Sequence, residues 1–159
     1  MAFGKIVICG VGLIGGSLAL SLRRSGYRGN IVGLERNREI LSRAHALGIV
    51  DDAGSSPEDT FRDADLLVLA VPVAQTANVL RSVMPYLPDG MIITDTGSTK
   101  TNVVAMAREV LGAQVGRFVP AHPSSLPCLL SLSSAGLGAA LEFFPVHHHA
   151  LVGALSDGA

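Results

Sequence analysis

Short apolar runs alternate with longer segments of helical periodicity along the first 120 residues of the chain. The runs are uninterrupted and rich in Ile, Val and Leu, as is typical of strands buried on both faces of a parallel sheet. They predict strands over residues 5–9, 30–35, 65–71, 91–95 and 117–120, with a further short strand near Ile49 and Val50. The intervening segments predict helices over residues 13–25, 38–47, 57–62, 76–86 and 101–111.

Buried strands that alternate with amphipathic helices indicate a parallel sheet covered by helices on both faces. Right-handed crossovers then give a doubly wound α/β fold of the Rossmann type. Boundary residues agree with this pattern, because Gly26 and Gly48 follow the first two predicted helices as stop signals. Ser56 precedes the third as a candidate N-cap. We therefore expect one dinucleotide-binding Rossmann domain over residues 1–123.

The pattern changes after Pro123. Residues 124–159 contain only two charged residues, Glu142 and Asp157, and are rich in Ser and Leu without a helical or alternating period. We expect an atypical tail here, which is either a natural loop-rich extension or a truncated or frame-shifted end. The tail contains three adjacent histidines at positions 147–149. Adjacent side chains do not readily converge on one ion, so we predict no metal site.

Composition narrows the class of partner. The chain has 159 residues, the length of about one domain, and 48% of them are hydrophobic, which suits a packed core. The net charge of −1 indicates neither a nucleic acid nor an anionic membrane surface as a partner. The two cysteines, Cys9 and Cys128, have no metal or redox spacing, which favours reduced thiols in a cytoplasmic protein.

The amino-terminal segment does not have the organisation of a signal peptide. Residues 6–22 are mostly apolar, but four glycines interrupt them. Arg23 and Arg24 then follow, where a cleavage site would require small residues. The sequence also lacks a run of about 20 uninterrupted apolar residues. We therefore expect neither secretion nor a membrane span.

The sequence GVGLIG follows the first predicted strand, opens the first predicted helix and fits the pattern G-x-G-x-x-G. Gly10 would allow the tight turn, Gly12 the close approach of a pyrophosphate, and Gly15 the packing of helix on strand. The phosphates would then meet free N–H groups at the helix start, which include those of Leu13 and Ile14. The pattern in this context predicts a dinucleotide site, and a purely structural glycine turn is the alternative.

An acidic residue ends the second predicted strand. Glu35 lies 20 residues after Gly15, where a carboxylate accepts hydrogen bonds from ribose hydroxyls and repels a 2′-phosphate. This position favours NAD. Arg36 and Arg38 follow, and because an arginine here can hold a 2′-phosphate, NADP stays open as the alternative.

Two further turns follow the fourth and fifth predicted strands. Ligands of open α/β sheets bind outside the carboxyl ends of the strands, so both turns are expected to line the nicotinamide end of the cleft. Val71 and Pro72 form the first turn, and Gly97 and Ser98 lie in the second. Ser98 or Thr99 would serve equally as an N-cap of the following helix.

His122 follows the last predicted strand. Its imidazole titrates near neutral pH, so it could accept the proton of a substrate hydroxyl during hydride transfer. An ordinary turn or surface histidine is the alternative interpretation.

Four motifs together resemble the prephenate/arogenate dehydrogenases of tyrosine biosynthesis. They are GVGLIGGS at 10–17, AVP at 70–72, DTGSTK at 95–100 and FVPAHP at 118–123. The resemblance covers about residues 4–123 in the family's order, and the last two motifs are the more specific.

The resemblance implies an NAD(P)-dependent oxidative decarboxylation of prephenate or arogenate, small-molecule substrates. It implies that the histidine matching His122 bonds the substrate hydroxyl and helps remove its proton. The serine matching Ser98 would support that histidine and the nicotinamide. The family is also dimeric through a C-terminal helical domain that supplies an arginine for the substrate carboxylate.

The sequence departs from the family after His122 and Pro123. The family continues with a segment of the type A-G-x-E-x-x-G, whereas this chain continues SSLPC, and the 159 residues contain no sequence for the helical domain. We therefore expect dinucleotide binding but little or no turnover by this chain alone. Two alternatives remain: a non-catalytic NAD-binding or sensor module, and another small Rossmann dehydrogenase of the β-hydroxyacid dehydrogenase or pyrroline-carboxylate reductase type.

Overall fold

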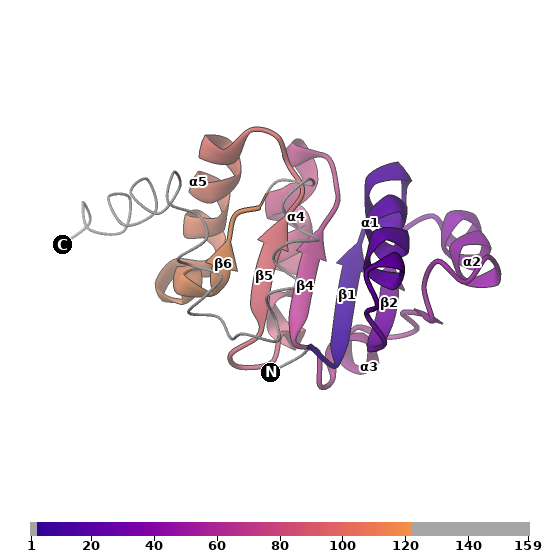
Figure 1. Ribbon diagram of the computed structural model, residues 1–159. Helices are drawn as coiled ribbons and strands as arrows, with labels where there is room; N and C mark the ends of the chain where they lie inside the picture. The colour runs from indigo at the N-terminus through magenta and orange to yellow at the C-terminus, as the bar shows by residue number, and fades with distance from the viewer. Residues whose placement is uncertain (1–2, 122–159) are drawn as a thin grey trace.

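The computed structural model describes residues 3–121, which form a parallel sheet flanked by helices (Figure 1). The strands are β1 (Lys5–Cys9), β2 (Asn30–Leu34), β3 (Asp52–Ala53), β4 (Leu66–Leu69), β5 (Ile92–Asp95) and β6 (Phe118–Val119). The α-helices are α1 (Leu13–Arg24), α2 (Arg38–Ala46), α3 (Pro57–Phe61), α4 (Val73–Val83) and α5 (Lys100–Leu111). Two 3₁₀ segments complete the order, η1 (Met84–Tyr86) and η2 (Gly112–Arg117). His122 and the predicted tail at 124–159 lie outside the described residues.

The strand order across the sheet is β3-β2-β1-β4-β5-β6, and every neighbouring pair is parallel. The chain starts in the middle of the sheet, builds outwards to β3, and then crosses back to place β4 on the other side of β1. The order therefore reverses between β1 and β4. This topology confirms the predicted doubly wound Rossmann-type fold, in which such a reversal opens a crevice at the carboxyl ends of the strands.

Two apolar layers cover the two faces of the sheet. Successive residues of a strand point to opposite faces, so Ile6 and Ile8 of β1 pack in one layer and Val7 and Cys9 in the other. The first layer includes buried side chains of α1 and α2, and the second those of α3, α4 and α5. Burial on both faces explains why the sequence of β1 is apolar throughout rather than alternating.

The first two α-helices end in the same hydrogen-bonded turn. After α1, the N–H of Gly26 donates to Arg23 and that of Tyr27 to Leu22, with Gly26 at φ +93°. After α2, Gly48 has φ +65° and occupies the equivalent position. These are Schellman turns, which require the left-handed backbone that glycine adopts without a steric penalty. Both glycines are thus confirmed as stop signals.

The predicted third strand was misplaced. Ile49 is still part of the turn that ends α2, because its N–H donates to the carbonyl of Ala44. Val50 is buried in the core without pairing to β2. The strand is β3, whose Asp52 and Ala53 are exposed at the sheet edge and give no hydrophobic signal.

The fourth predicted helix was also shifted. It begins directly after Pro72 and ends at Val83, and Met84–Tyr86 continue as a 3₁₀ turn. Pro85 lies inside that turn and has no N–H to continue the α-helical hydrogen bonds, although Met84 before it keeps helical backbone angles. The other predicted elements agree with the structure to within two residues at each end. Among the described residues, no helix is both long and apolar enough to cross a membrane.

Candidate dinucleotide site

The carboxyl ends of four neighbouring strands are aligned at one edge of the sheet. Cys9 of β1 pairs with Leu34 of β2 on one side and with Leu69 of β4 on the other, and Leu69 pairs with Asp95 of β5. The ladder continues one residue beyond β1, where the N–H of Gly10 donates to the carbonyl of Leu34 at 2.9 Å. The turns that follow these strands are therefore neighbours in space, as the sequence predicted.

Three glycines of the turn after β1 meet three different requirements. Gly10 has φ +91°, and a Cβ there would lie 2.4 Å from the carbonyl oxygen of Ala70. A Cβ on Gly15 would lie 1.9 Å from the carbonyl oxygen of Gly10. Around Gly12 a Cβ would meet nothing within 4 Å. Gly10 and Gly15 therefore hold the turn tightly against the sheet, whereas Gly12 leaves open space.

The α-helices that follow the central strands β1, β4 and β5 begin without a capping side chain. Their N-cap residues are Gly12, Pro72 and Thr99, and in the described part of the chain none makes a side-chain cap hydrogen bond. By contrast, α2 is capped by Asn37 and α3 by Ser56. The uncapped helix starts leave N–H donors and positive dipole ends at the edge where the strand order reverses.

The start of α1 has the geometry of an anion site. Leu13 and Ile14 are its first helical residues, and their N–H groups have no preceding helical carbonyl to bond. Leu13 is 92% exposed, so this end of the helix is open to solvent rather than packed in the core. A pyrophosphate fits here, because free N–H groups, a helix dipole and the space at Gly12 coincide.

Glu35 reaches from the end of β2 to the same turn. Its Oε2 accepts a hydrogen bond from the N–H of Val11 at 3.3 Å, and its Oε1 accepts one from the N–H of Asn37 at 3.1 Å. Both bonds fix the half-buried carboxylate beside the glycine turn, at the position predicted for ribose recognition. Arg36, which follows it, is exposed.

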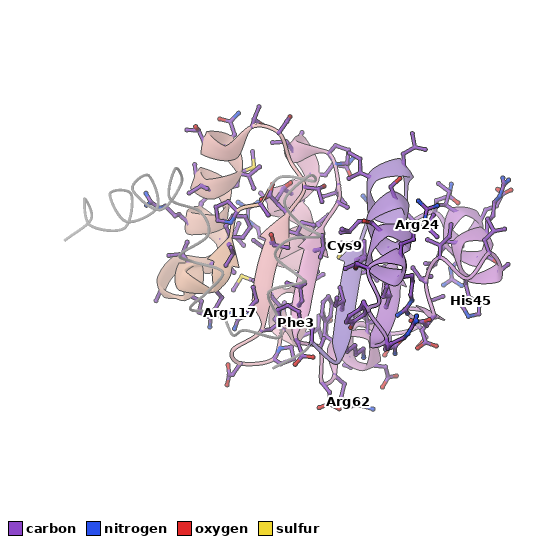
Figure 2. The ribbon with its side chains drawn as sticks, viewed as in Figure 1. Phe3, Cys9, Arg24, His45, Arg62 and Arg117 are labelled. Atoms are coloured by element: carbon purple, nitrogen blue, oxygen red, sulfur yellow. The ribbon has the colours of Figure 1, made fainter. Side chains whose placement is uncertain are left out.

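Cys9, labelled in Figure 2, is the last residue of β1 and immediately precedes the glycine turn. Its side chain packs in the second apolar layer. Burial raises the pKa of its thiol from 9.0 to about 12, and the neighbouring Glu35 carboxylate adds to the rise. The thiol is therefore protonated at neutral pH and acts as a small apolar side chain rather than as a nucleophile.

The turns after β4 and β5 complete the edge. A Cβ on Gly10 would lie 3.1 Å from the side chain of Val71, so the turn after β4 packs against the glycine turn. Pro72, the next residue, is the N-cap of α4. A Cβ on Gly97 would lie 3.3 Å from Val73 at the start of α4, so the β5 turn packs against that helix. Ser98 follows and is exposed.

The predicted capping role at the β5 turn is only partly correct. Thr99 is the N-cap residue of α5, but its hydroxyl makes no capping hydrogen bond. The other predicted catalytic residue, His122, falls just beyond the last described residue, Ala121, so its placement stays a prediction.

Two residues of this edge were given no role from the sequence, although one of them, Asp95, begins the DTGSTK motif. Asn37 caps α2 and bonds Glu35, and an Asn before a helical segment was the available signal. Asp95 is only 1% exposed, and its carboxylate accepts hydrogen bonds from the N–H groups of Gly97 and Ala121. An acidic residue that ends an apolar strand was the signal here.

Comparison with known proteins agrees with this geometry. Residues 18–125 match the family model described as prephenate dehydrogenase, nucleotide-binding domain. The chain belongs to this family. The matched range includes the turn at Gly97 and Ser98, and it includes His122.

Similar sequences and solved structures agree with this family assignment. The chain is 35% identical over 120 residues to the prephenate dehydrogenase of Lactococcus lactis, an alignment that covers 75% of this chain and 33% of the relative. It is similar to the crystal structure of prephenate dehydrogenase from Aquifex aeolicus in complex with hydroxyphenyl propionate and NAD⁺. That likeness has a TM-score of 0.69 and 36% identity, and it covers 77% of this chain and 42% of the solved one.

A second solved structure, the arogenate dehydrogenase of Synechocystis, matches with a TM-score of 0.64 and 30% identity over 74% of this chain and 40% of that one. The chain thus spans between a third and about two fifths of the proteins named here.

Proposed function

We propose that this chain is the cofactor-binding portion of an NAD-dependent dehydrogenase that oxidatively decarboxylates prephenate or arogenate in the cytoplasm. One observation supports the proposal most: Gly12 has open space around it and lies at an uncapped helix start. The glycines on either side of it, Gly10 and Gly15, have no room for a side chain. Membership of the prephenate dehydrogenase family adds the substrate class. The relative whose structure contains NAD⁺ supports the choice of cofactor.

Each part of the edge has a task in this proposal. The N–H groups of Leu13 and Ile14 bind the pyrophosphate, and the carboxylate of Glu35 accepts hydrogen bonds from the adenosine ribose. Val71, Pro72 and Gly97 line the nicotinamide end. NAD⁺, when bound, supplies the acceptor for the substrate hydride. His122 takes the proton of the substrate hydroxyl, and Ser98 supports His122.

Cofactor choice tests the role of Glu35. We expect titration calorimetry to show tighter binding of NAD⁺ than of NADP⁺, because the carboxylate repels a 2′-phosphate. Glu35→Gln removes that charge and should reduce the ratio of the two affinities by about tenfold. Glu58→Gln, an exposed acid in the first turn of α3, is the matched control and should leave the ratio unchanged. An equal ratio in Glu35→Gln and the wild-type chain would contradict the proposed role.

Turnover tests the substrate class. The purified chain is expected to bind NAD⁺ but to convert prephenate or arogenate at a negligible steady rate, because it spans only a third to about two fifths of the length of its relatives. The measurement is NADH formation at 340 nm with each substrate. Steady turnover by the chain alone would overturn this expectation. Adding a family helical domain in trans should raise the rate, and His122→Asn should abolish that gain while NAD⁺ binding stays intact.

A further inference from the structure

Asp95 is a buried acid at the carboxyl end of β5. Its side chain is 1% exposed, a burial that is costly for a carboxylate unless hydrogen bonds replace its water. Both oxygens accept such bonds from the backbone. Oδ2 accepts from the N–H of Gly97 at 2.7 Å, and Oδ1 accepts from the N–H of Ala121 at 3.4 Å.

These two donors are 24 residues apart in the chain, and each immediately precedes a predicted catalytic residue. Gly97 is followed by Ser98, and Ala121 is followed by His122. The paired register of β5 and β6 ends at Thr94 and Val119, so the carboxylate continues the connection between the two segments beyond the end of the ladder.

The hydrogen bond between Gly97 and Asp95 also explains why residue 97 is a glycine. A Cβ on Gly97 would lie 2.9 Å from Oδ2 of Asp95 and 3.2 Å from Val103. Glycine at position 97 therefore allows its N–H to approach the carboxylate closely. Aspartate suits position 95 because both donors point at it and a carboxylate only accepts. An asparagine would turn an NH₂ group towards one of them.

We propose that Asp95 is a positioning residue, whose carboxylate holds the turn at Gly97 and the chain at Ala121 in a fixed relation, directly before the two proposed catalytic residues, Ser98 and His122. The inference rests on the proposed function for the roles of Ser98 and His122, but the link itself rests on the contacts of Asp95 alone. Asp95 touches neither reacting atoms nor cofactor in this account and acts through the two segments it joins.

Amide hydrogen exchange of the full 159-residue chain, followed by NMR, tests the link without cofactor. Asp95→Asn should raise the exchange rates of the Gly97 and Ala121 amides by about tenfold or more, because the NH₂ group faces one of these donors and the other keeps only an uncharged acceptor. Asp65→Asn is the matched control. The Oδ2 of Asp65 accepts hydrogen bonds from the N–H groups of Gly4 and Lys5 at the amino ends of the strands. This variant should therefore raise the exchange rates of those two amides instead.

Addition of NAD⁺ then tests the positioning role by a spectroscopic signature. In the wild-type chain we expect NAD⁺ to shift the resonances of the Ser98 amide and the His122 ring. In Asp95→Asn the NAD⁺-induced shifts of Ser98 and His122 should fall to less than about half of their wild-type size. The NAD⁺-induced shifts of Leu13 and Gly15, at the proposed pyrophosphate position, should stay unchanged. The Asp65→Asn chain should respond as the wild type does.

The outcomes separate the two proposals. If Asp95→Asn leaves the exchange of Gly97 and Ala121 and the NAD⁺ responses of Ser98 and His122 at wild-type values, the inference is overturned. If the wild-type chain shows no NAD⁺ response at Leu13 and Gly15, the proposed function fails, and the exchange data still decide whether the link exists. Should Asp95→Asn not fold, scalar coupling between the Gly97 amide nitrogen and the Asp95 carboxyl carbon in the wild-type chain replaces it, and its absence overturns the inference.

Discussion

At the scale of single residues, the structure adds to the glycine motif the atoms that each glycine approaches. The pattern G-x-G-x-x-G predicted the role of each glycine, and the structure gives each a contact: Gly10 against Ala70, Gly15 against Gly10, and Gly12 against open space. Asp95 begins the DTGSTK motif, but the motif gave it no role. Its link to Ala121 crosses between segments far apart in the sequence, so only the folded chain reveals it.

Cys9 gives a prediction at this scale. With Cys128 replaced by Ser to leave one thiol, native Cys9 should react with iodoacetamide at pH 8.5 at least about 100-fold more slowly than in the unfolded chain, because burial disfavours the thiolate. The pKa rise from 9.0 to about 12 also means that this group's contribution to folding stability is complete below pH 9 and is lost as the pH rises towards 12. Rapid labelling of the native chain at pH 8.5 would show that Cys9 is not buried as described.

At the scale of elements, the buried strands were predicted well and the edge strand was not. Burial on both faces makes β1 and β4 continuous apolar runs, which the sequence displays directly. The two residues of β3 pair with β2 and are exposed, so no apolar pattern marks them. Their one printed side-chain link to β2 is polar, since Oδ2 of Asp52 accepts a hydrogen bond from the side-chain amide of Asn30. Helix ends marked by Gly26 and Gly48 were found because their positive φ demands glycine.

Replacement of Gly48 tests the turn that ends α2. Gly48→Ala should lower the free energy of unfolding by about 1 kcal/mol, because φ +65° is strained for a residue with a Cβ even though a Cβ there would meet nothing within 4 Å. Urea denaturation measures the change. Gly116→Ala in η2 is the control, since its position is equally open and has no positive φ, and it should change stability by less than about 0.5 kcal/mol. Equal effects of the two variants would argue against the left-handed turn.

At the scale of the whole molecule, the parallel topology assembles the site. The glycine turn, Glu35, the Val71–Pro72 turn and the Gly97–Ser98 turn are far apart in sequence, yet all follow strands whose carboxyl ends share one edge. The rule that ligands bind outside the carboxyl ends of parallel strands predicts from the sequence alone that these turns lie together. The details that topology does not dictate, namely the uncapped starts of α1, α4 and α5 and the contacts of Asp95, required the structure.

We propose that NAD⁺ binds this chain with its pyrophosphate in the space at Gly12. Titration calorimetry of NAD⁺ into the wild-type chain, Gly12→Ala and Gly116→Ala tests it most directly, because neither added methyl group meets protein atoms within 4 Å. Only the first would occupy the proposed phosphate position. We predict that Gly12→Ala keeps a cooperative melting transition and weakens NAD⁺ binding by about tenfold or more, while Gly116→Ala binds as the wild type does. Unchanged NAD⁺ affinity in a folded Gly12→Ala chain would contradict the account.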